Sequence, residues 1–293
     1  MMSSGIRTES SRCASFVNLL RIGTSALLML GSTTLLGCGD DATSTPDGTV
    51  EITVETLPLP DTTEVDAIAM NGEIEGRWAM LETQTALVTT QILGTQVQTS
   101  VSYYLADFAA GKLSVTLCDW LTDDDAHLTT TRMGDKVLAS LTPLVRTYNV
   151  TPAGNGFAFE AKRGYALRGV ALEHIDTDPM PTEAADPTVL DQDTDGQPGI
   201  TLVVQGTITG QLYVAHRHIA ALSGALESDT RISGLTEWTT EQSIFGSEPA
   251  LLAAQKPVAI THPDADKSHF VMVKVAGSDT CASINAARPT LFP

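Results

Sequence analysis

Short segments in which apolar and polar residues alternate, separated by turn residues, recur along this chain and restrict it to strand-rich folds. In residues 113–120, for example, Leu113, Val115 and Leu117 share one face at a period of two. Similar segments recur from about residue 67 to the C-terminus, with glycine-containing turn signals roughly every 8–12 residues. The pattern predicts a single all-β domain over residues 67–293, an antiparallel barrel or sandwich.

The predicted elements are short strands and at most one or two short helices. Residues 110–112 are suited to a hairpin between the second and third strands. Helical patterns occur only at residues 135–145, limited by Pro143, and at residues 247–255, where Ser247 is a candidate N-cap. Strands and helices do not alternate, which argues against a parallel nucleotide-binding sheet. The predicted strands are residues 78–89, 97–105, 113–120, 147–151, 157–161, 165–172, 200–208, 211–218, 231–239, 258–261 and 269–275.

The N-terminus has the features of an export signal. Residues 1–21 carry three arginines and one glutamate, and the apolar run of residues 22–36 is too short to span a bilayer as a stable helix. The run ends in Leu35-Leu36-Gly37-Cys38, which resembles the lipobox of bacterial lipoproteins. That resemblance implies a signal peptide over residues 1–37, cleavage before Cys38 and acylation of its thiol. An ordinary secretory signal is the alternative.

The resemblance also implies a location. A lipid-anchored protein belongs to the cell envelope, and Gly39 in place of aspartate favours the outer membrane. Residues 38–66 carry eight acidic residues and no lysine or arginine, a composition that predicts a solvated tether. The whole chain has 17 basic and 35 acidic residues, a net charge of −18, so nucleic acid is not an expected partner. The expected partners are the membrane, through the lipid anchor, and a small apolar ligand or an envelope component. The expected state is a monomer.

The four cysteines divide into two pairs by position. Cys13 leaves with the signal peptide and Cys38 carries the lipid, so Cys118 and Cys281 remain in the domain. Two remaining cysteines in an exported domain predict a disulfide between them, with two free thiols as the alternative.

The clearest chemical motif lies in an acidic loop. Residues 173–196 hold eight acidic residues and end in Asp191-Gln-Asp193-Thr-Asp195-Gly196-Gln197-Pro-Gly199. This resembles the D-x-D-x-D-G calcium loops of EF-hand, dockerin and thrombospondin type 3 modules. The resemblance implies that Asp191, Asp193 and Asp195 bind Ca²⁺ through their carboxylates and Gln197 through its carbonyl.

The loop departs from the EF-hand pattern after its glycine. An EF-hand loop has a bidentate glutamate at its twelfth position. Counted from Asp191, that position here is Leu202, and the chain continues into a predicted strand. Asp178 and Asp186 are the nearest candidates for the missing ligands. The calcium would be structural, and a solvated acidic loop without an ion is the alternative.

Two further motifs each allow two interpretations. Gly76-Arg77-Trp78 resembles the G-x-W that opens lipocalin barrels, and it also fits a buried tryptophan after a turn glycine. His216 and His218 share one face of a predicted strand, where they could bind zinc with a third ligand or lie on the polar face.

Function is predicted only by class. Nucleophile elbows, zinc-protease motifs and phosphate-binding loops do not occur in the sequence, so no catalytic residue is assigned. The chain as a whole resembles uncharacterised acidic lipoproteins of myxobacteria that carry a D-x-D-x-D-G-x-P-G loop. We expect a non-enzymatic binding or envelope-structure module. A carboxylate-dependent hydrolase of envelope polymers is the alternative.

Overall fold

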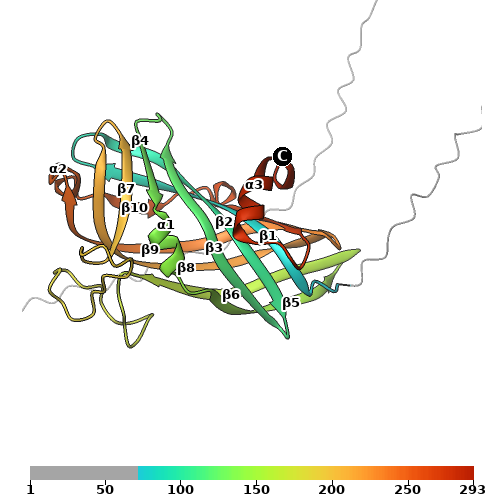
Figure 1. Ribbon diagram of the computed structural model, residues 1–293. Coiled ribbons are helices and arrows are strands. Elements are labelled where there is room, and N and C mark those ends of the chain that lie inside the picture. The colour runs from blue at the N-terminus through green and yellow to red at the C-terminus, as the bar shows by residue number, and fades with distance from the viewer. Residues whose placement is uncertain (1–71) are drawn as a thin grey trace, which may run out of the picture. The chain divides into compact units, whose positions relative to one another are not determined.

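A computed structural model of the chain describes residues 72–293 (Figure 1). The predicted signal peptide, Cys38 and the tether lie outside these residues. The described residues belong to one compact unit and are mostly antiparallel strands, which confirms the predicted fold class. None of the helices within residues 72–293 has the length and apolar character needed to cross a membrane.

The elements follow one another along the chain with short connections, apart from one long loop between β6 and β7. The strands are β1 (Gly76–Thr90), β2 (Gly94–Ala109), β3 (Lys112–Asp124), β4 (Thr129–Met133), β5 (Leu144–Ala153), β6 (Gly156–Arg168), β7 (Ile200–Gly206), β8 (Gly210–Ser228), β9 (Arg231–Glu248), β10 (Val258–Thr261) and β11 (His269–Lys274). The helices are α1 (Asp135–Ser140), α2 (Leu251–Ala254), the 3₁₀ turn η1 (Ala265–Lys267) and α3 (Cys281–Leu291).

The sheet closes on itself. Strands pair antiparallel in the order β1, β2, β3, β5, β6, β8, β9, β11, and β11 pairs back with β1. Closure pairs the edge strands with one another, and the side chains on the inner face form the interior of a barrel.

The long strands change partners along their length, which divides the barrel into two ends. At one end β3 and β8 pair with β5 and β6, and at the other they pair with β4 and β7, which also pair with each other. Likewise β1 pairs with β11 near Trp78 and with β10 near Val88. We call the first the core end and the second the cavity end. Figure 1 shows β4, β7, β10 and α2 gathered at the cavity end.

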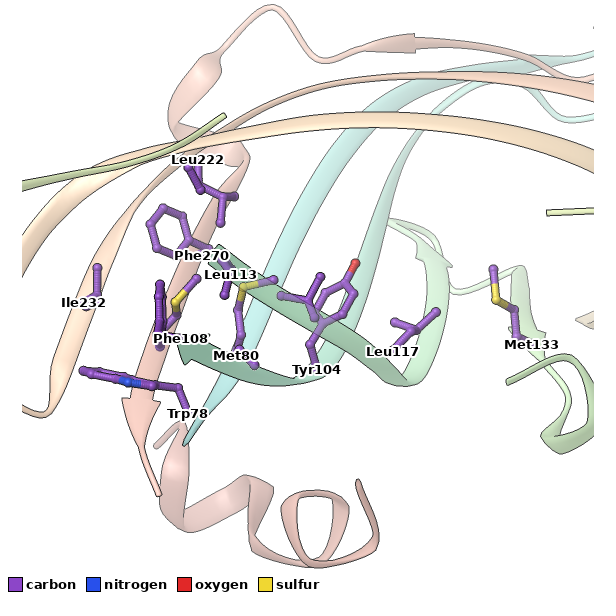
Figure 2. Close-up of a cluster of buried hydrophobic side chains, with 14 of the residues drawn as sticks. Trp78, Met80, Tyr104, Phe108, Leu113, Leu117, Met133, Leu222, Ile232 and Phe270 are labelled. Carbon is purple, nitrogen blue, oxygen red and sulfur yellow. The ribbon is translucent and has the colours of Figure 1, made fainter. Parts of the chain in front are cut away.

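Aromatic and aliphatic side chains fill the core end. The ring of Phe108 makes edge-on contacts with Trp78, Tyr148 and Phe159, at centroid distances of 5.9, 4.8 and 5.9 Å. Figure 2 shows Trp78, Phe108 and Phe270 close together. Trp78 is fully buried, and its indole N–H donates to the Ile74 carbonyl. Trp78 is therefore buried near the start of β1, a position that both interpretations of Gly76-Arg77-Trp78 allow.

One bulge in β3 and one in β6 change which side chains of these strands face the interior. In β3 the register shifts at Cys118, so Leu117 faces inward before the bulge and Trp120 and Thr122 line the interior after it. In β6 the register shifts between Ala161 and Gly164, after which Arg168 faces inward. An extra residue reverses the alternation of a strand, and here it places a tryptophan and an arginine inside.

Helix α3 lies outside the barrel and is joined to it covalently. Cys118 of β3 and Cys281 at the start of α3 form a disulfide with a Cα–Cα distance of 5.0 Å, in agreement with the predicted pair. Arg288 adds an ion pair to Asp119 at 2.7 Å and lies over the ring of Tyr103. Residues 72–293 contain three α-helices and one 3₁₀ turn, where the sequence predicted at most two short helices. The pattern of α3 is weak because its single fully buried residue is Ile284 and it contains Pro289.

Most strands are longer than predicted, and the largest differences concern β4, β6, β8 and β9. β6 is one continuous strand where two were predicted, because the bulge interrupts its alternation. β4 was missed because Thr129-Thr-Thr-Arg-Met133 offers one apolar residue. β8 and β9 extend well beyond residues 211–218 and 231–239.

Candidate functional site

A cavity of about 420 Å³ occupies the cavity end of the barrel. This volume is typical of pockets that hold small molecules. Apolar side chains form much of its wall, including Val88, Trp120, Leu202, Leu212 and Trp238. Serine, threonine and glutamine side chains from β1, β2, β3, β4 and β9 alternate with them.

A set of buried polar side chains closes the cavity toward the core end, and we call it the polar cluster. Each member except His216 is 9% exposed or less, and His216 is half-buried and faces the cavity. The polar cluster consists of Glu82, Gln84, Tyr104, Arg146, Arg168, His216 and His218.

Hydrogen bonds connect part of the cluster. The amide nitrogen of Gln84 lies 3.0 Å from a Glu82 carboxylate oxygen and 3.3 Å from Nε2 of His218, and donates to both. Arg168 Nη1 donates to Nδ1 of His216 at 3.2 Å. On the other side of that ring, Nε2 lies 2.6 Å from Oγ1 of Thr240.

These partners fix the protonation of His216. A guanidinium has no acceptor, so Nδ1 of His216 must carry a lone pair and Nε2 the proton. Burial, followed by the positive charge of Arg168, lowers the pKa of His216 to about 3. The same causes hold the pKa of His218 well below its ordinary value. Both imidazoles are therefore neutral at physiological pH.

The arginines of the cluster carry charge without an ion-pair partner. Within residues 72–293, neither Arg146 nor Arg168 has a carboxylate oxygen within 4.0 Å, whereas Arg77, Arg217 and Arg288 do. Arg146 donates to the Ala220 carbonyl, and its Nε is buried without a partner in the described part of the chain. Burial lowers the pKa of both guanidinium groups, and the negative charge of Glu82 opposes this effect. Arginine stays protonated at neutral pH even so.

A second, smaller cavity of about 140 Å³ lies on the other side of the cluster and shares Tyr104, Arg168 and His218 with the first. Glu82 is the one carboxylate among the described residues that line either cavity. Neither of these two cavities is lined by a pair of carboxylates facing each other.

The acidic loop folds as a separate structure outside the barrel, between the end of β6 and the start of β7. Arg217 of β8 holds it by donating to the carbonyls of Ile175 and Asp178 at 2.8 and 2.7 Å. Gly199 lies against β8 with φ near +92°, and a Cβ there would come within 2.2 Å of the Val214 carbonyl oxygen. Only glycine fits at this point of return to the sheet.

The three aspartates of the predicted calcium motif come together. Carboxylate oxygens of Asp191, Asp193 and Asp195 lie within 4.8 Å of one another. Asp191 accepts from the backbone of Asp195 and Gly196, and Asp195 accepts from the Gln197 N–H and the Thr201 hydroxyl.

Asp193 differs from its two neighbours in its burial. Its side chain is 5% exposed, and Oδ2 accepts from the Thr201 N–H at 3.2 Å. Oδ1 has no partner among the described residues. Burial, with a smaller contribution from the neighbouring aspartates, raises the pKa of Asp193.

Other predicted ligands are not part of this group. Asp178 accepts from the His174 N–H, and Asp186 from the N–H and hydroxyl of Thr188, so both are used within the loop. His216 and His218 face the interior rather than a polar outer face, and the charge of Arg168 beside His216 disfavours a zinc ion there.

Sequence reasoning missed most of the polar cluster, although two signals for it exist. Glu82 and Gln84 lie on the inward face of β1, which they share with Trp78 and Met80. A charged side chain on the buried face of a strand is unusual. His216 and His218 likewise lie on the same face of β8 as apolar residues. The inward direction of Arg168 depends on a bulge that the sequence does not reveal.

Neither a protein-family model, nor a curated protein, nor a solved structure matches this chain.

Proposed function

We propose that this chain is a lipid-anchored, non-enzymatic binding module of the cell envelope that holds a small apolar ligand inside its barrel. The observation that supports it best is the cavity of about 420 Å³, because close packing normally leaves few voids larger than a water molecule. The core end of the same barrel is filled by large side chains such as Trp78, Phe108 and Phe270. The anchor and the outer-membrane location rest on the lipobox resemblance at Cys38.

Binding of the neutral dye N-phenyl-1-naphthylamine tests this function. The assay uses the full chain with Cys38→Ser, because this substitution removes the proposed acylation site and allows a preparation without detergent. We expect the dye to bind with enhanced fluorescence, and Thr131→Trp to abolish binding because Thr131 lines the cavity. Thr130→Trp is the matched control, since residue 130 precedes it on β4 and is not part of the lining. Equal binding by the two variants would mean that the dye binds elsewhere.

We also propose a structural calcium ion bound by Asp191, Asp193 and Asp195. The supporting observation is the buried carboxylate oxygen of Asp193 without a partner in the described chain, beside two further carboxylates. Ca²⁺ takes six to eight oxygen ligands, so carbonyls such as that of Gln197, or water, must complete the shell. The ion would fix the loop against β7 and β8.

Thermal unfolding in calcium and in EDTA tests the ion. Calcium at 100 times its Kd should add about 2.7 kcal/mol to the free energy of unfolding. Asp193→Asn should remove that dependence, while Asp176→Asn, an exposed aspartate of the same loop, should keep it. A melting temperature that is the same in millimolar calcium and in EDTA would refute this proposal and leave the cavity function intact.

A further inference from the structure

The polar cluster carries a net positive charge in a buried position. At formal charges it contains two guanidinium groups and one carboxylate, and both histidines are neutral. Arg168 is 6% exposed, lines both cavities and donates to His216, a neutral partner. A buried charge without a carboxylate at ion-pair distance is unfavourable, so an anion at this position would be stabilised.

The neighbours of Arg168 leave its charge available to a ligand. Nε2 of His216 is hydrogen-bonded to Thr240 on the far side of the ring. The nitrogen that faces Arg168, Nδ1, is therefore fixed as an acceptor. Gln84 and His218 are hydrogen-bonded to each other, and Gln84 also binds Glu82, the one carboxylate of the cluster. A ligand carboxylate entering from the cavity would meet N–H groups of Arg168, with Tyr104 also in the lining.

Apolar side chains predominate toward the opening of the cavity, where Thr90 and Gln255 also line it. Side chains of the β1–β2 connection and of the segment around α2 and β10 line its outer part, among them Leu93, Leu252 and Pro257. Ile92 and Val258, which also line it, are 56% and 63% exposed. A ligand with an anionic head and an apolar body would match this gradient from charged floor to apolar mouth.

Building on the proposed cavity function, we propose that the ligand is a carboxylate-headed monoanion with an apolar body. Its carboxylate binds Arg168 on the cavity floor and its body extends toward the mouth. One negative charge balances the one excess positive charge of the cluster. A head with two negative charges would instead leave the cluster and ligand together with one buried negative charge.

A matched pair of probes tests this assignment. 11-(Dansylamino)undecanoic acid and its methyl ester share the same body, but the head is a carboxylate in the first and an uncharged ester with one added methyl group in the second. Trp120 and Trp238 in the wall can transfer excitation energy to a bound dansyl group. In the full chain with Cys38→Ser, we expect the acid to bind about 10- to 100-fold more tightly than the ester at pH 7.5.

Substitutions then assign the preference to Arg168. Arg168→Gln should lower affinity for the acid to near that for the ester, and unchanged ester binding shows that the variant is folded. Arg163→Gln is the control, since Arg163 lies on the same strand but is exposed and paired with Glu237 at 2.9 Å. It should keep the full preference for the acid.

The outcomes separate the two proposals. Equal affinity of the unsubstituted cavity for acid and ester would overturn the carboxylate assignment and leave the cavity function standing. A preference that survives Arg168→Gln would also overturn the assignment. If neither probe binds and the neutral dye also fails, the proposed function itself is refuted.

Discussion

The neutral state of His216 makes the stability of the domain depend on pH in a calculable way. The folded-state pKa of His216 is about 3 and the ordinary value is 6.5, so between these pH values only the unfolded chain takes up this proton. The stabilisation is complete above pH 6.5 and is lost as the pH falls toward 3. The loss amounts to about 1.4 kcal/mol per pH unit, or about 2 kcal/mol at pH 5.

The variant His216→Gln isolates this contribution. Glutamine can still accept from Arg168 and donate to Thr240, but it does not titrate. The free energy of unfolding is measured in urea at pH 8 and at pH 5. Between these pH values it should fall by about 2 kcal/mol less in the variant than in the unsubstituted chain. Carboxylates titrate in both proteins and cancel in the comparison. His269→Gln, at an exposed position, should retain the full decrease. An equal decrease in all three proteins would refute a neutral imidazole at His216.

Three further predictions concern packing, the disulfide and the anchor. Phe108→Ala should lower the free energy of unfolding in urea by about 3–5 kcal/mol, because three aromatic rings contact Phe108. Val145→Ala, at a 58% exposed position, should change it by less than about 0.5 kcal/mol. Replacing both Cys118 and Cys281 by serine should cost up to about 5 kcal/mol, because the disulfide joins residues 163 apart, and an unchanged urea midpoint would contradict this. Cys38→Ser should move the protein from the membrane fraction to the soluble fraction on cell fractionation, and a chain that stays in the membrane fraction would argue against acylation at Cys38.

The sequence predicts the fold class well because strand formation is a local signal. Alternation at period two requires only that one face be buried, and most of the predicted strands occur in the structure. Closure of the barrel cannot be predicted in this way, because it depends on pairing β11 with β1, far apart in the chain. The division into a core end and a cavity end likewise arises from partner exchange along β1, β3 and β8.

The candidate sites differ in how far sequence could reach them. The Asp191, Asp193 and Asp195 group is local, and the structure brings these three carboxylates together as the spacing suggests. The polar cluster assembles from β1, β2, β5, β6 and β8, and one member, Arg168, faces inward only after a bulge in β6. A site built from distant strands and a reversed alternation leaves no continuous motif in the sequence.

A ligand carboxylate that binds Arg168 inside the barrel should lie there in its ionised form. Carbon-13 NMR of palmitate labelled at its carboxyl carbon measures this directly in the protein–palmitate complex. The carboxyl resonance should keep its ionised chemical shift from pH 8 to pH 5.5, and it should titrate within this range once Arg168 is replaced by glutamine. A resonance that titrates alike in the unsubstituted and Arg168→Gln proteins would show that Arg168 does not hold the ligand carboxylate.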